Sequence, residues 1–167
     1  MPTQLYTCVV IPLFDAAGNL PPGIHWADWP EFAGRFGSTL HRQQLLAGLV
    51  GALDSLHTAG CRAVYIDGSF VTSKEVPGDY DGCWSIQNVD PALLDPVLLD
   101  FSNSRAAQKA RYGGELFPAE LPEGMTGTIW FDFFQRDKDG NPKGIVALDT
   151  SAWTPGQLGS LSSRNKV

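Results

Sequence analysis

Residues 61–86 constrain the fold of this chain more than any other stretch. The apolar, β-branched segment 61–67 predicts a strand, and it leads directly into Gly68 and Ser69. A loop rich in turn-forming residues follows, and a second strand is predicted over 79–86. The chain therefore contains two predicted strands that are joined through a Gly-Ser turn and a loop.

Helices and further strands are predicted on both sides of this stretch. Leucines spaced three and four residues apart predict the longest helix, over 38–58. The other predicted helices are 28–37, 93–101 and 102–112, and the other predicted strands are 6–14, 128–134 and 144–148. The Pro- and Gly-rich segment 113–127 is interpreted as a connection. Because strands alternate with helices, we expect the α/β (α+β) class, with a small mixed β-sheet flanked by helices.

Length and charge narrow the class of protein. The 167 residues predict a single domain over 1–150 and a flexible C-terminal tail over 151–167. With 12 basic and 18 acidic residues, the net charge of −6 argues against a protein that coats nucleic acid. No predicted helix has the basic character of a recognition helix, so sequence-specific DNA binding is not expected.

The remaining composition predicts a cytoplasmic protein. The sequence has no run of about 18 apolar residues, so no membrane span is expected. Its three cysteines are far apart and odd in number, which argues against a disulfide framework or a zinc ribbon.

Two aspartates at the start of the second predicted strand are the strongest candidates for a metal site. Side chains alternate along a strand, so Asp79 and Asp81 point to the same face, with Cα atoms about 6–7 Å apart. Like charges on one face repel each other unless a cation lies between them, and carboxylate oxygens suit Mg²⁺ or Mn²⁺. The alternative is a solvated pair, because such sequences are common near turns.

The Gly-Ser turn is a candidate phosphate site. Gly68 allows close approach of the backbone, and Ser69 offers its N–H and hydroxyl to a phosphate. A phosphate cradle followed by a carboxylate pair is what metal-assisted phosphoryl or nucleotidyl transfer needs.

Basic residues near this pattern are candidates for neutralising triphosphate charge or guiding an RNA backbone. Lys74 lies in the loop, and Arg105, Lys109 and Arg111 lie in one predicted helix. Arg105 and Lys109 are four residues apart and therefore share a helix face. Lys109 is the first candidate, and a solvated helix face is the alternative.

A family resemblance appears at these residues. Gly68-Ser69, nine residues, and then Asp79-Tyr80-Asp81 are similar to the motif of the DNA polymerase β-like nucleotidyltransferase superfamily. The segments 66–74, 114–119, 131–135 and 143–146 also resemble a little-characterised group of short bacterial proteins within it. The resemblance implies a nucleotidyltransferase-like fold in which Asp79 and Asp81 hold Mg²⁺, Gly68 and Ser69 hold phosphate, and two metal ions bridge a triphosphate.

The resemblance also asks for a third carboxylate on a later strand. Asp132 fits, because both faces of the predicted strand 128–134 are apolar and a lone carboxylate there is costly unless a metal or a donor satisfies it. A carboxylate that caps a backbone N–H is the alternative for Asp132, and Asp100 is the second candidate for the third ligand.

These residues predict a metal-dependent nucleotidyltransferase that moves an NMP from an NTP to an acceptor hydroxyl. Asp132 would help to deprotonate the acceptor, which is an RNA end, a protein or a small molecule. By resemblance alone, the setting is a toxin–antitoxin pair or phage defence, with a toxin or antitoxin as partner. The alternative is an inactive module of the same fold that acts by nucleotide or protein binding, for example as an antitoxin, since Asp67 and Gly82 depart from the motif.

Overall fold

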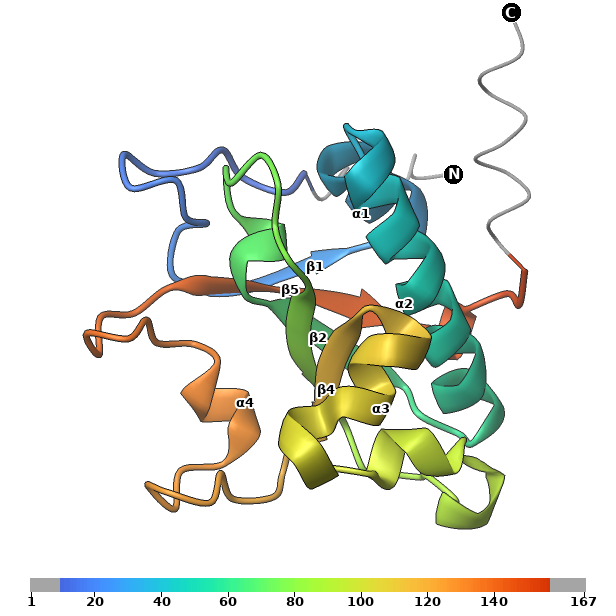
Figure 1. Cartoon of the computed structure of the whole chain (residues 1–167). Helices are drawn as coiled ribbons and strands as arrows, with labels where there is room; N and C mark the ends of the chain where they lie inside the picture. The colour runs from blue at the N-terminus through green and yellow to red at the C-terminus, as the bar shows by residue number, and fades with distance from the viewer. Residues whose placement is uncertain (1–9, 157–167) are drawn as a thin grey trace, which may run out of the picture.

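Five strands in the part of the chain that the structure describes, residues 10–156, form one mixed sheet (Figure 1). The structure is a computed structural model, and residues 1–9 and 157–167 lie outside the described part. The strands are β1 (Gly23–Ala27), β2 (Ala63–Asp67), β3 (Tyr80–Trp84), β4 (Gly114–Pro118) and β5 (Gly144–Asp149). Their order is β1-β5-β2-β3-β4, with β1–β5 and β3–β4 parallel, whereas β2 is antiparallel to both of its neighbours.

Four α-helices accompany the sheet in the same part of the chain. They are α1 (Trp29–Phe36), α2 (Leu40–Thr58), α3 (Ser102–Tyr112) and α4 (Trp130–Phe133). The first two begin at residues that cap them: Asp28 accepts a hydrogen bond from the N–H of Glu31, and Thr39 accepts one from the N–H of Arg42. None of the described helices combines the length and the apolar character needed to cross a membrane.

The strands divide the interior into two apolar clusters, one on each face of the sheet. Consecutive side chains of a strand point to opposite faces. Ile66 and Leu116 therefore pack in the larger cluster, with α1 and α2. Cys83 and Phe117 face the other way, in a smaller cluster with Phe134, which follows α4. The odd-numbered residues of β2, β3 and β4 thus share the face that α4 covers, while α2 and α3 cover the opposite face (Figure 1).

The expected class, a mixed α+β fold with a small mixed sheet flanked by helices, is confirmed. The predicted strands 61–67, 79–86 and 144–148 appear as β2, β3 and β5, and the predicted helices 28–37, 38–58 and 102–112 appear as α1, α2 and α3.

Two predicted elements near the prolines are wrong. The predicted helix 93–101 is replaced by two short 3₁₀ turns, Pro91–Leu93 and Pro96–Leu99, because proline lacks the N–H that a helix interior requires. Of the predicted strand 6–14, residues 10–14 form no strand, and residues 6–9 lie outside the described part.

The predicted strand 128–134 is also wrong, because its centre is the helical turn α4. The N–H groups of Phe133 and Phe134 donate to the carbonyl oxygens of Ile129 and Trp130, which closes the turn. Aromatic residues favour strands when no other force acts. Here the Trp130 ring stacks on Phe117 with a centroid separation of 3.8 Å, and that packing outweighs the propensity.

Order continues beyond the expected domain end at residue 150. The Trp153 ring is buried, meets Trp29 edge-on at 5.2 Å, and donates a hydrogen bond from Nε1 to Asp54. Thr150, fully buried, donates from its hydroxyl to the carbonyl of Cys61. The described beginning of the predicted tail is therefore docked through Trp153, and its residues 157–167 lie outside the described part.

Candidate active site

Strand register brings three carboxylates into one row across the sheet. Asp81 in β3 lies opposite Asp67 in the antiparallel neighbour β2 and opposite Glu115 in the parallel neighbour β4. Residues paired in this way point to the same face, which here is the face of α4. Asp79 stands two residues before Asp81 and joins the group. Ligand oxygens of Asp79, Asp81 and Glu115 lie within 4.8 Å of one another, and these three carboxylates are called the acidic group below.

The centre of the row carries unbalanced negative charge. Burial, followed by repulsion from Asp79 and Glu115, raises the pKa of Asp81 to about 7. The pKa of Asp79 is also raised, first by burial and then by Glu115, against the smaller opposing effects of Lys109 and Lys74. Among the described residues, no ion pair reaches either aspartate.

The two ends of the row are neutralised by lysine and arginine. Glu115 binds Arg105 and Lys109 of α3, each at 2.7 Å. Burial alone would raise the pKa of Glu115, but these ion pairs together hold it below its usual value. Asp67 binds Lys143 at 2.9 Å, and its pKa nevertheless stays raised because burial outweighs the lysine. The row is therefore balanced at its ends and short of positive charge in the middle.

The Gly-Ser turn lies directly against this centre. Gly68 has φ +79°, a left-handed conformation, and a Cβ at this position would collide with the Asp81 carboxylate. Ser69 follows and opens a 3₁₀ turn, Ser69–Val71. Only glycine fits between the end of β2 and Asp81, which explains why this residue directly follows the strand.

Two departures from the nucleotidyltransferase motif have local structural reasons. Asp67 stands where the motif expects an apolar residue, and its charge is met by Lys143, which directly precedes β5. Gly82 stands at another apolar position, and a Cβ there would run into the Tyr65 carbonyl and approach Leu116 at 3.2 Å.

A buried arginine holds the loop between the Gly-Ser turn and Asp79. Arg42 is 4% exposed, and its guanidinium donates to the carbonyl oxygens of Phe36, Phe70, Thr72 and Lys74. His41 Nε2 lies 2.5 Å from the Pro77 carbonyl oxygen, near the end of the same loop. The first turn of α2 therefore fixes the path of residues 70–77. Sequence reasoning missed Arg42, although its position three and seven residues before Leu45 and Leu49 places it on the apolar face of the helix.

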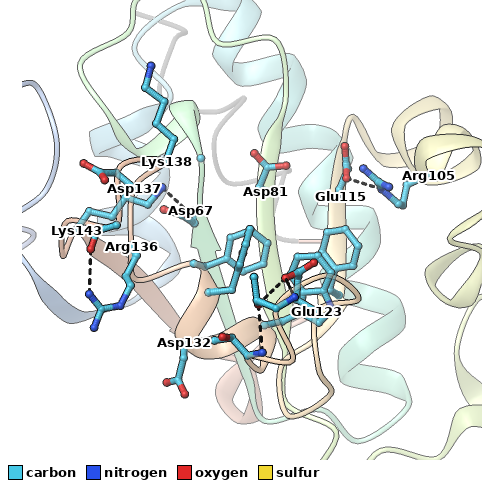
Figure 2. Close-up of a pocket in the computed structure, with 18 residues that line it drawn as sticks. Asp67, Asp81, Arg105, Glu115, Glu123, Asp132, Arg136, Asp137, Lys138 and Lys143 are labelled. Atoms are coloured by element: carbon cyan, nitrogen blue, oxygen red, sulfur yellow. Dashed lines mark hydrogen bonds and ion pairs between the residues drawn. The ribbon is translucent and has the colours of Figure 1, made fainter.

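The row opens into a pocket of about 780 Å³ beside α4 (Figure 2). Three kinds of side chain line it. The acidic ones of the row are Asp67, Asp81 and Glu115, the basic ones are Arg105, Arg136, Lys138 and Lys143, and the aromatic ones are Phe117, Trp130, Phe133 and Phe134. Figure 2 shows Asp81 between Asp67 and Glu115, with Arg136, Lys138 and Lys143 on the Asp67 side and Arg105 on the Glu115 side.

The structure brings together most of the residues that the sequence singles out. Asp79 and Asp81 belong to the acidic group, Gly68 lies against the Asp81 carboxylate, and Lys109 contacts the group through its ion pair with Glu115. Lys74 is exposed on the loop, close enough for its charge to lower the pKa of Asp79.

Asp132 is not part of the group. It lies on α4 with an exposed side chain, and Figure 2 shows its carboxylate directed away from Asp81 and Glu115. The costly burial that suggested it as the third ligand is therefore wrong. Asp100 also lies outside this group: it is half-buried, and its carboxylate accepts hydrogen bonds from the N–H and the hydroxyl of Ser102.

Glu115 takes the third place in the acidic group, and sequence reasoning missed it. The Pro/Gly-rich segment 113–127 was interpreted as a connection, so the short strand β4 within it went unpredicted, as did β1. The available signal was the alternation of Glu115 and Phe117 with Leu116, which is typical of a strand with two different faces.

The chain belongs to a family of unknown function, DUF6932, whose model matches residues 12–149. No curated protein and no solved structure matches it. The matched region contains all five described strands, the acidic row and the pocket.

Proposed function

We propose that this protein is a metal-dependent nucleotidyltransferase that moves an NMP from an NTP to an acceptor hydroxyl. One observation carries the proposal: the carboxylates of Asp79, Asp81 and Glu115 converge beside the Gly68–Ser69 turn, at the wall of an open pocket. Carboxylates on neighbouring strands beside a phosphate-binding turn form a site suited to a nucleotide and its divalent cation.

The acidic group fits Mg²⁺ or Mn²⁺ by its chemistry. It offers three oxygen ligands from three carboxylates, which is the donor type that these hard cations prefer. The pKa of Asp81 is raised first by burial and then by repulsion from Asp79 and Glu115, and among the described residues no ion pair reaches its carboxylate. Bound there, the cation would supply positive charge to the transferring phosphate and to the pyrophosphate that leaves.

The other residues of the site have roles that follow from their positions. Gly68 lets the backbone approach a phosphate closely, and the Ser69 hydroxyl and N–H can donate to it. Lys138 lines the pocket opposite Glu115 and would bind phosphate oxygens, whereas Lys143 beside it is paired with Asp67.

The NTP and the acceptor hydroxyl are the only two reactants that the transfer needs. The acceptor oxygen forms a bond to the α-phosphorus, the bond to the oxygen bridging the α- and β-phosphates breaks, and pyrophosphate leaves. The proton of the acceptor hydroxyl passes to a carboxylate of the acidic group. This role falls to the group of Asp79, Asp81 and Glu115, because Asp132 lies outside it.

The resemblance to the polymerase β-like superfamily supports the same function. It asks for a third carboxylate on a later strand, and β4 supplies Glu115 next to Asp81. The nature of the acceptor, whether an RNA end, a protein or a small molecule, and a toxin–antitoxin or phage-defence setting remain predictions from that resemblance.

The test is transfer of label from each α-phosphate-labelled NTP, with Mg²⁺ or Mn²⁺, into RNA and protein of a lysate. We expect label in one acceptor class, and its loss in Asp81→Asn. Asp132→Asn is the matched control, because it removes an acidic charge from the same pocket but not from the acidic group. Undiminished transfer in a folded Asp81→Asn protein, or no label with any nucleotide, would contradict the proposal.

The second candidate is a nucleotide-binding module without transfer activity. The observation that favours it is that Glu115 is already held by Arg105 and Lys109, so that the third ligand is compensated without a metal. Calorimetry with Mn²⁺ and each NTP, combined with the label assay, separates the two candidates. The module would bind nucleotide and transfer no label, whereas the transferase would do both.

A further inference from the structure

Four aromatic side chains that line the pocket form what we call its aromatic floor: Phe117, Trp130, Phe133 and Phe134. We propose that this floor binds the nucleobase of the donor nucleotide and that Phe133 is the ring on which the base stacks. Purines should therefore bind more tightly than pyrimidines. This inference rests on the proposed function, because it assigns the remainder of the same substrate.

The aromatic floor lies at nucleotide distance from the acidic row. Phe117 follows Glu115 by two residues on β4 and points to the same face, which places the two about 6–7 Å apart along the strand. Arg105 links them, since it binds Glu115 and its guanidinium carbon lies 5.6 Å from the Phe117 ring centroid. A ribose spans a comparable gap between a base and its α-phosphate.

Phe133 is the ring of the aromatic floor that is most open. Its side chain is 41% exposed, whereas Phe117 and Phe134 are 6% and 7% exposed. It stands edge-on to Trp130 at 5.3 Å and to Phe134 at 5.6 Å, so two neighbours fix its orientation. Trp130 in turn stacks on Phe117, which ties α4 to the sheet. The pocket thus presents one fixed, exposed ring on a buried aromatic base.

The combination of groups selects a nucleotide over other ligands with a flat ring. The same pocket carries carboxylates for a divalent cation and the basic side chains of Arg136 and Lys138 for phosphate oxygens. A ligand that uses all of these needs a flat base, several phosphates and a bound cation at once. Stacking on an aromatic ring is open to every base, and its strength grows with the area of the base, which is why purines should bind more tightly.

Phe101 provides a matched control for Phe133. It is 39% exposed and stacks on Phe117, a ring of the aromatic floor, at 5.8 Å, but it does not line the pocket. Phe133→Ala therefore removes a ring inside the pocket, and Phe101→Ala removes a ring of nearly the same exposure outside it.

The experiment measures binding of adenosine, which has no phosphate, in the absence of metal, by saturation-transfer NMR. We expect adenosine to bind, Phe133→Ala to weaken binding roughly 5-fold to 100-fold, and Phe101→Ala to change it less than about twofold. Phe133→Trp should retain binding, and guanosine should bind more tightly than uridine or cytidine. The inference is overturned if adenosine does not bind, if the two alanine variants behave alike, or if pyrimidine nucleosides bind as tightly as purine nucleosides.

A further variant separates this inference from the proposed function. Asp81→Asn should bind adenosine as the natural protein does, although it transfers no label. Adenosine binding that requires Phe133, in a protein without transfer activity, would retain the nucleobase site and reject the transferase. Transfer that proceeds equally in Phe133→Ala and Phe101→Ala would retain the transferase and reject the nucleobase site.

Discussion

The two faces of the strands β2, β3 and β4 are built from alternate residues of the same short segments, yet one face is an apolar core and the other carries the acidic row. On one face, Ile66, Tyr80 and Leu116 are buried against the helices, and each is at most 1% exposed. On the other face, their neighbours Asp81 and Glu115 form the acidic row over the pocket.

The difference shows how stability and chemistry are divided within one sheet. Burial of the apolar face provides a favourable free energy that grows with the area removed from water. The acidic face opposes it, because carboxylates that are close together and partly buried repel one another and lose hydration. The apolar face therefore supplies the stability of the sheet, and the acidic face reduces it.

The largest effect on the acidic face is expected from Glu115→Gln, which should lower the rate of transfer. It preserves the size of the side chain but removes one of the three ligands of the acidic group, so transfer should fall about 100-fold or more. Asp132→Asn should stay within about threefold, since that carboxylate lies outside the group. Both rates come from the same labelled-NTP assay. The reverse ranking would restore Asp132 as the third ligand and reject Glu115.

On the opposite face, Leu116→Ala should lower stability without touching the site. The side chain is fully buried in the larger cluster, so the cavity should cost about 2–5 kcal/mol in the free energy of unfolding. Urea unfolding measures the loss, and Mn²⁺ affinity of the folded variant should remain near that of the natural protein. A loss below about 1 kcal/mol would mean that this face contributes less than its burial implies.

Asp81→Asn should stabilise the metal-free protein, which sharpens the contrast between the faces. The pKa of Asp81 is raised to about 7, so between pH 4 and pH 7 the folded state binds more protons than the unfolded state. The stability of the metal-free protein should therefore fall as pH rises through this window and level off above it. The asparagine variant should lack most of that fall and gain about 2–4 kcal/mol at pH 8.

Thermal unfolding across this pH range tests the prediction, with and without Mg²⁺. Added Mg²⁺ should raise the melting temperature of the natural protein at pH 8 more than at pH 5, because Asp81 is then ionised. An asparagine variant that is less stable than the natural protein at pH 8 would contradict the unbalanced charge inferred for the row.

The smallest effect is expected from Arg42→Lys, at the loop that carries the turn to the acidic face. Lysine keeps the charge but lacks the planar fork that reaches four carbonyls, so we expect a loss of about 1–2 kcal/mol. Amide hydrogen exchange should quicken over residues 70–77. Arg62→Lys, at an exposed arginine, is the control and should leave exchange unchanged.

The sequence predicted those parts of the fold and site whose signal is local. The leucine spacing of α2 and the strand ends around Gly68 and Asp81 depend on neighbours within a few residues, and they were confirmed as elements. Glu115 depends on the parallel pairing of β4 with β3, a contact between distant segments that no short pattern contains. Its strand of five residues begins with a glycine and ends with a proline, two residue types that are rare in strands, and this hid it further.

The incorrect assignment of α4 has the opposite cause, because there a local signal was strong and misleading. The aromatic residues around Asp132 favour a strand by propensity. Their actual conformation is decided by Phe117, which lies on a different element and provides the surface on which Trp130 stacks. Local preference thus gave way to packing between segments, and the carboxylate moved from an expected core position to the surface.

The position of β5 in the sheet has a consequence for how the chain is made. Of the strands that the structure describes, β5 is the last to leave the ribosome, yet it lies between β1 and β2. Until residues 144–149 have emerged, β1 has no strand to pair with and one edge of β2 stays open, while β2, β3 and β4 can already assemble. Lys143 arrives at the same moment, so Asp67 waits with its charge unpaired. A nascent chain that stalls before this point exposes strand edges that invite pairing with other chains, which makes the emergence of residues 143–149 decisive for correct folding.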